Sequence, residues 1–360
     1  MDKVIAFPIM GNYHVPAYYL FSKITSHKVI KTPLITSHTI ELGSKYSPDF
    51  ICTPFKYTLG SFIECLDKGA NVLIQMGGGC RYGYYYELQE KILKNLGYEF
   101  KYYNLVSKGH TDIKLIYKII KEIDTNFKLI KGLHYLLITR YMIKYMDYIE
   151  NYIRKNKAYE VTKGSFDCIY DEMLNEMVKV NSLYKLNRLF RKYKKKILNV
   201  KINKPKNNIR IAIIGELFTL MEPFANYNIE DALIKMGVEI KRFTNVNYLL
   251  FEKSKKSKKF LKKLKNIKYK MGADAMDNIY YTKYLIDNNY DGIIHIKSSF
   301  CTPEIGSMSI INKMCEENNM PILFISMDTN TSKVGIETRL EAFYDMIEMR
   351  KKSEEMLFRN

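Results

Sequence analysis

Two segments of the sequence, 221 positions apart, share one pattern, and this repeat constrains the fold more than any other feature. Residues 70–80 align without a gap to residues 291–301, and each segment is an apolar run followed by a turn that ends in a cysteine. A helix-like stretch and a second apolar run follow each cysteine. This order is typical of a β–loop–α–β unit with parallel strands. The sequence therefore predicts an α/β fold built from two related units.

The beginning of each half supports the same fold class. Residues 4–8 and 209–214 are short apolar runs that lead into Met10-Gly11 and Gly215-Glu216. A strand that ends in a glycine turn before a helix is the usual start of an α/β unit. A helix over 228–236 that stops at Gly237 is expected to follow the second of these runs, because glycine is favoured just past a helix end.

The chain of 360 residues is long enough for two or three domains. We expect an N-terminal α/β domain over 1–110, a helical connecting region over 111–207 and a C-terminal α/β domain over 208–360. Lys204-Pro205-Lys206 marks the second boundary. The last segment, 338–358, has the apolar spacing of a helix that docks through one face. That face comprises Leu340, Phe343, Met346 and Ile347.

The net charge of +19 comes from two short strips. Residues 185–206 and 253–270 each hold ten Lys or Arg and no acid, and the remaining 320 residues are close to neutral, at −1. Such strips are most often solvated helix faces, and the alternative is a surface for phosphates, a nucleic acid or an acidic partner. No RNA-recognition signature accompanies them, so nucleic-acid binding is the weaker hypothesis.

The compartment expected for this chain is the cytosol. The sequence has no uncharged apolar stretch of membrane-spanning length, and its first residues lack the apolar core of a signal peptide. Six scattered cysteines are too few for a disulfide scaffold, so each cysteine is structural, catalytic or a metal ligand.

Three cysteines differ from the others in their expected position. Cys52, Cys80 and Cys301 are predicted to follow strands and to stand at or just before helix starts, where thiolates are stabilised. Cys52 and Cys301 both begin a Cys-Thr-Pro sequence. An iron–sulfur cluster, a zinc ion and a lone nucleophilic cysteine all remain open on this pattern. The other cysteines are expected to be core residues, as is a histidine of the second repeat: Cys65, Cys168, Cys315 and His295.

The turn before Cys80 is rich in glycine but matches no phosphate-binding motif. Gly77-Gly78-Gly79 permits a close backbone approach to a bulky cofactor, whereas Tyr82 stands where a dinucleotide fingerprint needs its last glycine. The sequence also lacks a Walker A motif, a zincin motif and a nucleophile elbow. We expect Arg81, directly after Cys80, to contribute positive charge to the same site.

Several of these motifs together resemble one protein family. The resemblance is to the 2-hydroxyacyl-CoA dehydratase component D family. It rests on four segments in this order: Glu41–Lys56 with Cys52-Thr53-Pro54, Gly77–Tyr85, Phe300-Cys301 with Pro303-Glu304, and 338–343. More narrowly it is similar to the acyl-CoA dehydratase activase-related members, also called CoA protein activases. The match runs in order through nearly the whole chain.

The resemblance implies a fold, a cofactor and partners. It implies two Rossmann-like three-layer domains with one [4Fe–4S] cluster in the interdomain cleft, held by Cys52, Cys80 and Cys301. From their own chemistry we expect the glycine turn Gly77–Gly79 and Arg81 to line that site. It also implies anaerobic one-electron chemistry on acyl-CoA thioesters, driven by an ATP-dependent activator and shared with a homologous dehydratase subunit. The alternatives are a non-catalytic accessory protein that binds the activator or helps cluster delivery, and a basic nucleic-acid-binding protein. The sequence names no catalytic residue, acyl group or fourth iron ligand, and it does not decide whether the chain is an enzyme.

Overall fold

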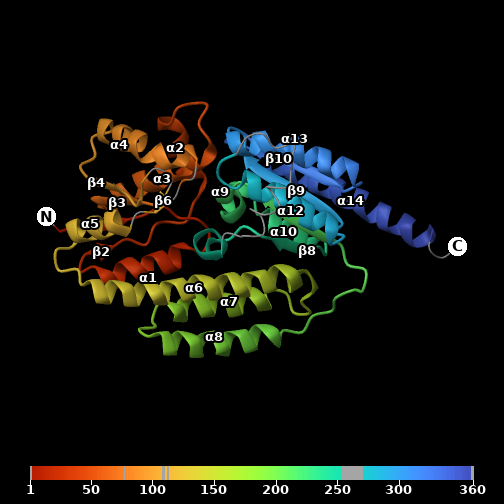
Figure 1. Cartoon of the computed structure of the whole chain (residues 1–360), viewed down its shortest axis with the longest axis horizontal. Helices are drawn as coiled ribbons and strands as arrows, with labels where there is room; N and C mark the ends of the chain where they lie inside the picture. Colours follow the sequence, from red (N-terminus) through yellow and green to blue (C-terminus); the bar gives the residue numbers. More distant parts are fainter. Residues whose placement is uncertain are drawn as a thin grey trace. The chain divides into compact units, whose positions relative to one another are not determined.

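The fold was analysed in a computed structural model, which describes residues 2–76, 78, 80–107, 110–111, 113–252 and 271–357. By packing, the chain divides into two compact units (Figure 1). Unit 1 comprises Met1–Lys144 and Leu174–Arg188, and unit 2 comprises Tyr145–Met173 and Leu189–Asn360. The long helices of the connecting region contribute residues to both units, so the three-part division made from the sequence stays a prediction.

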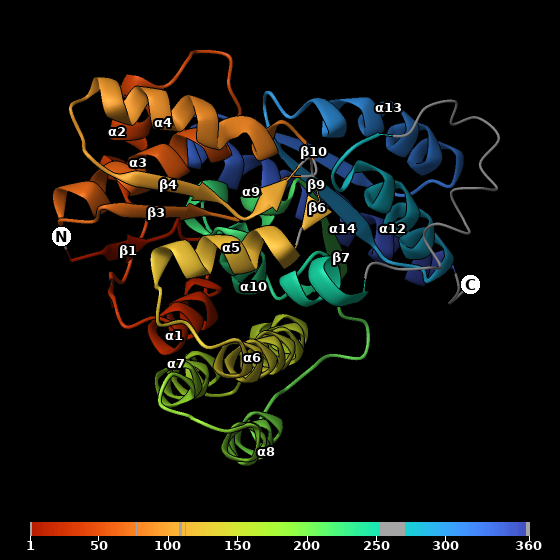
Figure 2. The same ribbon diagram turned by 60° about the vertical axis from the view of Figure 1, so that its left-hand side comes forward.

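Unit 1 is built on a four-stranded parallel sheet in the order β2-β1-β3-β4. Figure 2 shows α2, α3 and α4 on one face of this sheet and α1 and α5 on the other. Successive side chains of a strand point to opposite faces of the sheet, and both faces are covered by helices. Ala6 and Leu73 pack against α3 on one face. Ile5, Val72 and Ile74 pack toward α1 and α5 on the other face. The elements are β1 (Val4–Ala6), α1 (His14–Ile24), β2 (Lys28–Val29), α2 (Ser37–Tyr46), α3 (Thr53–Asp67), β3 (Val72–Gln75), the 3₁₀ turn η1 (Arg81–Tyr84), α4 (Tyr85–Asn95), β4 (Lys101–Asn104), the short pair β5 (Val106–Ser107) and β6 (His110–Thr111), and α5 (Ile113–Ile123).

Two glycines set the distance between α2 and α3. A Cβ added at Gly43 would lie 1.8 Å from the Lys56 carbonyl oxygen, and one added at Gly60 would lie 1.9 Å from that of Thr39. The two helices therefore approach backbone to backbone, which only glycine allows. This close crossing fixes the turn between the helices, and Cys52 is the last residue of that turn.

Unit 2 contains a second four-stranded parallel sheet, in the order β10-β9-β7-β8. Helices α12 and α13 cover one face, and α14 packs on the other, where a Cβ at Gly292 would lie 2.6 Å from the Ile347 side chain. The elements are η2 (Lys157–Tyr159), β7 (Arg210–Gly215), α9 (Leu217–Met221), η3 (Phe224–Asn226), α10 (Ile229–Lys235), β8 (Glu239–Arg242), a π-helical turn (Tyr248–Glu252), α12 (Ala275–Asp287), β9 (Gly292–Ser298), α13 (Thr302–Glu317), β10 (Ile322–Met327) and α14 (Lys333–Leu357).

The two sheets have the same topology. In each unit the strands, numbered in chain order within the unit, lie in the order 2-1-3-4. The aligned segments of the sequence repeat correspond to β3 and β9, the third strand of each unit. The predicted α/β class with two related parallel units is therefore confirmed. In α14, Leu340, Phe343 and Ile347 are buried as expected, whereas the expectation for Met346 is wrong, because its side chain is exposed.

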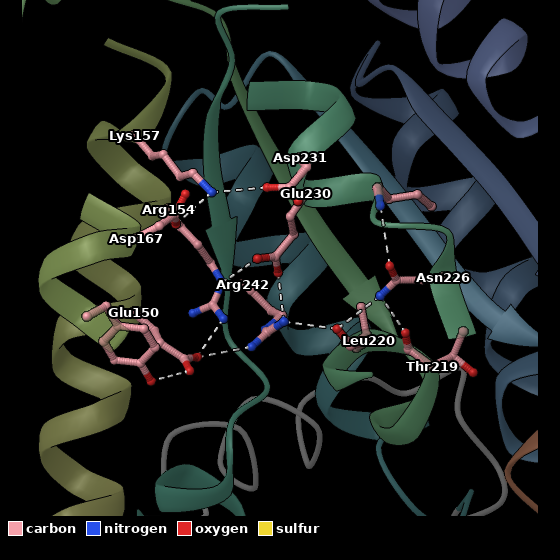
Figure 3. Close-up of polar contacts among 12 residues, drawn as sticks. Glu150, Arg154, Lys157, Asp167, Thr219, Leu220, Asn226, Glu230, Asp231 and Arg242 are labelled. Atoms are coloured by element: carbon pink, nitrogen blue, oxygen red, sulfur yellow. Dashed lines mark hydrogen bonds and ion pairs between the residues drawn. The ribbon is translucent and has the colours of Figure 1, made fainter. Parts of the chain in front are cut away.

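Three helices link the sheets along the chain: α6 (Leu129–Asn156), α7 (Ser165–Met177) and α8 (Leu183–Leu198). Within unit 2, a buried ion network joins α6 to the sheet (Figure 3). Arg154 of α6 bonds to Glu150 and Glu230 at 2.7 and 2.8 Å, and Arg242 of β8 bonds to Glu230 at 2.7 Å. The Tyr170 hydroxyl donates to Glu150 at 2.7 Å. The two carboxylates and two guanidiniums balance, as buried charges must.

Among the described residues, no helix is long and apolar enough to cross a membrane. The strip 185–206 begins on α8, where its Lys and Arg side chains are largely exposed, which agrees with a solvated helix face. The strip 253–270 lies outside the described residues.

Candidate functional site: cysteines at helix starts

The Cys80 loop follows β3, one of the two central strands of the unit 1 sheet. Strands β1 and β3 are neighbours, and the chain runs from β1 to β2 at one edge of the sheet and from β3 to β4 at the other edge. The carboxyl ends of β1 and β3 therefore form a topological switch point, which is where open α/β sheets bind ligands. Two amides at strand ends hold the loop, because Gln75 donates to the Tyr82 carbonyl at 2.9 Å and Asn104 donates to the Gly83 carbonyl at 3.1 Å. The sulfur of Cys80 accepts the Tyr82 backbone N–H at 3.5 Å.

The glycines before Cys80 are explained in part by contacts within the loop itself. Gly78 has φ +125°, and a Cβ there would lie 2.3 Å from the Gly83 nitrogen. Glycine is therefore required at this position for the loop to fold back on itself. Gly77 and Gly79 lie outside the described residues.

Cys52 is the N-cap of α3, with Pro54 in the first turn of the helix. Its sulfur makes no capping bond and lies 2.6 Å from the hydroxyl of Tyr85. Tyr85 is the first residue of α4. A thiolate at a helix N-terminus is stabilised by the helix dipole. Burial raises the pKa of Tyr85 far above its ordinary value, and Cys52 and Cys80 raise it further. The Tyr85 hydroxyl therefore keeps its proton, and when Cys52 is a thiolate this hydroxyl is the donor of the contact.

One expectation about Cys52 is wrong. Cys52 does not follow a strand, since the residues before it form the turn between α2 and α3 and Phe50 is 79% exposed. The short apolar pair Phe50-Ile51 is a turn because the chain must reverse between two closely packed helices. The expected helix start is nevertheless present at Cys52, and the structure brings Cys52 and Cys80 to the same tyrosine by a different route.

In unit 2, Cys301 occupies the position that Cys80 occupies in unit 1. It follows β9, caps α13 without a side-chain capping bond, and is 8% exposed. Its backbone N–H donates to the Ser298 carbonyl at 3.0 Å, which fixes the loop. Burial lowers the pKa of Lys297, while the nearby Cys301 and Glu304 oppose that shift. A buried cation therefore lies near this thiol.

A buried polar cluster lies between β9, α12 and α13, next to the Cys301 loop. Glu304 Oε2 accepts His295 Nε2 at 2.8 Å and the Asn278 amide at 3.0 Å, and the Ser307 hydroxyl lies 3.4 Å away. Asn278 also pairs with both backbone groups of Gly215, at the end of β7. These bonds tie the first turn of α13 to both central strands. His295 is fully buried, as expected, and its role in the fold is to bond Glu304.

The remaining cysteines differ from the first three. Cys65 and Cys315 are buried core residues, as expected, and burial raises their thiol pKa values to about 11 and about 12. The expectation that Cys168 is a core residue is wrong, because it is exposed on α7. Its helix packs through neighbouring residues such as Phe166 and Met173 instead.

The fit of a metal group can be judged from the donor set. Within the described part of the chain, no group of three or more His, Cys, Asp or Glu side chains is arranged to hold a metal ion. Unit 1 brings two thiols, Cys52 and Cys80, near the phenol of Tyr85. The charge of Arg81 also acts on this phenol and partly opposes the rise of its pKa. Two sulfur donors with hydrogen bonds from the protein suit an iron–sulfur group that takes its third thiolate elsewhere in the chain.

The sequence analysis missed two features of these sites. Tyr85 stands in a run of three tyrosines, and nothing in that run marks the middle one as the partner of a cysteine 33 positions away. Glu304 directly follows Cys301-Thr302-Pro303, and an acidic residue in the first turn of a helix is a signal that could have singled it out.

The fold and the loops define a two-unit α/β protein with cysteines at the starts of helices. The sequence profile of the family described as 2-hydroxyglutaryl-CoA dehydratase, D-component, matches residues 144–347, more than half of the chain. The chain therefore belongs to this family. The matched range contains Cys301 but neither Cys52 nor Cys80. No curated protein matches the chain.

Proposed function

We propose that this protein is an iron–sulfur subunit of a 2-hydroxyacyl-CoA dehydratase-type system. Cys52, Cys80 and Cys301 would hold one [4Fe–4S] cluster. The observation that carries the proposal is that Cys52 and Cys80, 28 positions apart, lie around one buried tyrosine in a member of this dehydratase family. When bound, the cluster would supply one-electron transfer, fed by an ATP-dependent activator, to chemistry on acyl-CoA thioesters.

The residues of the chain would bind and tune this group. Cys52 is the N-cap of α3 and Cys301 is the N-cap of α13, so both thiolates would stand at the positive end of a helix dipole. Arg81 directly follows Cys80 and brings a guanidinium next to this proposed ligand. Its charge would favour the reduced, more negative cluster and raise the reduction potential.

Cluster content tests the ligand assignment. Protein purified without oxygen is analysed for iron, acid-labile sulfide and an EPR signal after reduction. We expect Cys52→Ser, Cys80→Ser and Cys301→Ser each to lose most of the iron. Cys168→Ser is the matched control, because it removes an exposed thiol and should retain full iron. Full iron in Cys80→Ser would contradict the assignment.

A second assay separates a catalytic subunit from an accessory one. In the accessory role, the protein would bind the activator or help cluster delivery without acting on the thioester itself, and membership of the activase-related branch of the family stays part of the proposal. The cluster-loaded protein is incubated with an activator, ATP, a reductant and 2-hydroxyacyl-CoA thioesters, with and without a homologous dehydratase subunit. Dehydration supports the catalytic role, and activator binding with no turnover in either mixture supports the accessory role.

A further inference from the structure

The segment after β3 provides one hydrogen-bond donor for each of two cysteine sulfurs of unit 1, those of Cys80 and Cys52. The Tyr82 backbone N–H donates to Cys80 Sγ at 3.5 Å, and the Tyr85 hydroxyl lies 2.6 Å from Cys52 Sγ. The first donor belongs to the backbone, and only a proline substitution, which also restricts the chain, would remove it. The second belongs to a side chain, so its contribution can be measured.

The position of the Tyr85 ring is fixed by packing. The side chain is 6% exposed, and its ring meets that of Phe55 edge to face, with centroids 4.9 Å apart and an interplanar angle of 89°. The ring of Tyr82 lies 5.5 Å away on the same turn. Phe55 is in the first turn of α3, three residues after Cys52. The ring contact and the hydroxyl contact therefore join the same two helix starts, which keeps the hydroxyl on the sulfur.

We propose that Tyr85 is a positioning residue that donates its O–H to the Cys52 sulfur and raises the reduction potential of the iron–sulfur cluster. This inference rests on the function proposed above. A hydrogen bond to a ligand sulfur withdraws negative charge from it, and the reduced cluster carries one more negative charge than the oxidised one. The bond therefore stabilises the reduced state more than the oxidised state.

The test compares Tyr85→Phe with Tyr86→Phe by EPR-monitored redox titration of anaerobically purified protein. Tyr85→Phe removes the donor and keeps the ring that packs on Phe55. Tyr86→Phe removes the neighbouring hydroxyl, which bonds to Glu87 at 3.1 Å rather than to a cysteine. We expect Tyr85→Phe to disfavour reduction by about tenfold, which for one electron is a potential lower by ~59 mV. Tyr86→Phe should leave the potential unchanged.

Each outcome supports or overturns the proposal. A loaded Tyr85→Phe protein whose potential equals that of the wild type overturns the role of Tyr85 and leaves the cluster assignment standing. A wild-type protein without iron overturns both proposals. If Tyr85→Phe does not fold, as judged by circular dichroism, 3-fluorotyrosine placed at position 85 gives the second measurement. Its stronger O–H donor should raise the potential, and a fall or no change would contradict the proposal.

Discussion

Removing Arg242 should destabilise unit 2 through the buried ion network. Arg242 Nη1 donates to Glu230 at 2.7 Å and to the Leu220 carbonyl at 2.9 Å, and Nη2 lies 3.6 Å from Glu150. In Arg242→Met, the two carboxylates share Arg154 alone and the buried network carries one net negative charge. Breaking a buried pair costs about 3–5 kcal/mol. The Glu230 side chain keeps a quarter of its surface exposed, and Arg154 remains, so the low end applies.

This free-energy loss converts into a measurable melting shift. Unit 2 has about 200 residues, and a loss of ~3 kcal/mol lowers the Tm of a unit of this size by roughly 6–12 °C. Circular dichroism melts at pH 7 give the shift. Lys196→Met is the control, because it breaks an ion pair of equal length, 2.7 Å, between side chains that are nearly half exposed. Solvent screens such a surface pair, so its loss should leave the Tm nearly unchanged.

The pH dependence has a definite sign. Although burial opposes it, Arg154 and Arg242 hold the pKa values of Glu150 and Glu230 below the ordinary 4.5. This stabilisation is therefore present above pH 4.5 and is lost as the pH falls through the lowered values. The difference in Tm between wild type and Arg242→Met should be largest near pH 7 and shrink toward pH 4. The double variant Arg242→Met/Glu230→Gln should recover part of the loss. An Arg242→Met protein that melts within 1 °C of wild type would refute the reasoning.

Three further predictions concern the loops and the charged helix. Gly215→Ala should cost more than about 1–3 kcal/mol in urea unfolding, because φ is +138° and the new Cβ would lie 1.8 Å from the Ile296 oxygen of β9. Gly237→Ala is the comparison, because φ is +81° there but the new Cβ would contact no other atom, so only the backbone strain of about 1–2 kcal/mol is expected. Arg81→Ala should keep its iron but show a lower reduction potential in redox titration, and an unchanged potential would place Arg81 outside the site. Replacing three exposed cations of α8 by Gln should change stability by less than about 0.5 kcal/mol each, measured by melting: Lys185, Arg188 and Arg191.

The elements of the fold were predictable because their signals are local. Short runs rich in Val, Ile and Leu predict buried parallel strands, and both β3 and β9 are such runs and are buried along their whole length. The Cys-Thr-Pro sequence predicts a helix start, since proline suits the first turn, and both Cys52 and Cys301 are N-caps. In α14 the buried positions 340, 343 and 347 follow the helical repeat, and Met346 lies at its edge.

The surroundings of the cysteines were not predictable, because they depend on tertiary packing. The contact between Cys52 and Tyr85 requires α3 and α4 to meet at their N-termini, and the glycines at the crossing of α2 and α3 are what fix the Cys52 turn. No local pattern encodes that crossing. Likewise, the Phe50-Ile51 pair has the composition of a short strand, and only the tight packing of two helices makes it a turn.

The repeat and its side chains carry different information about function. The shared strand order and the ungapped match place Cys80 and Cys301 at the ends of equivalent strands, so the backbone alone determines where these thiols stand. Their environments are not shared. The Cys80 loop is held by strand-end amides and an aromatic turn, whereas the start of α13 is held by the Glu304 cluster, with the Lys297 amine near the Cys301 thiol. A property measured at one cysteine therefore cannot be assumed for the other, and each loop needs its own substitution series.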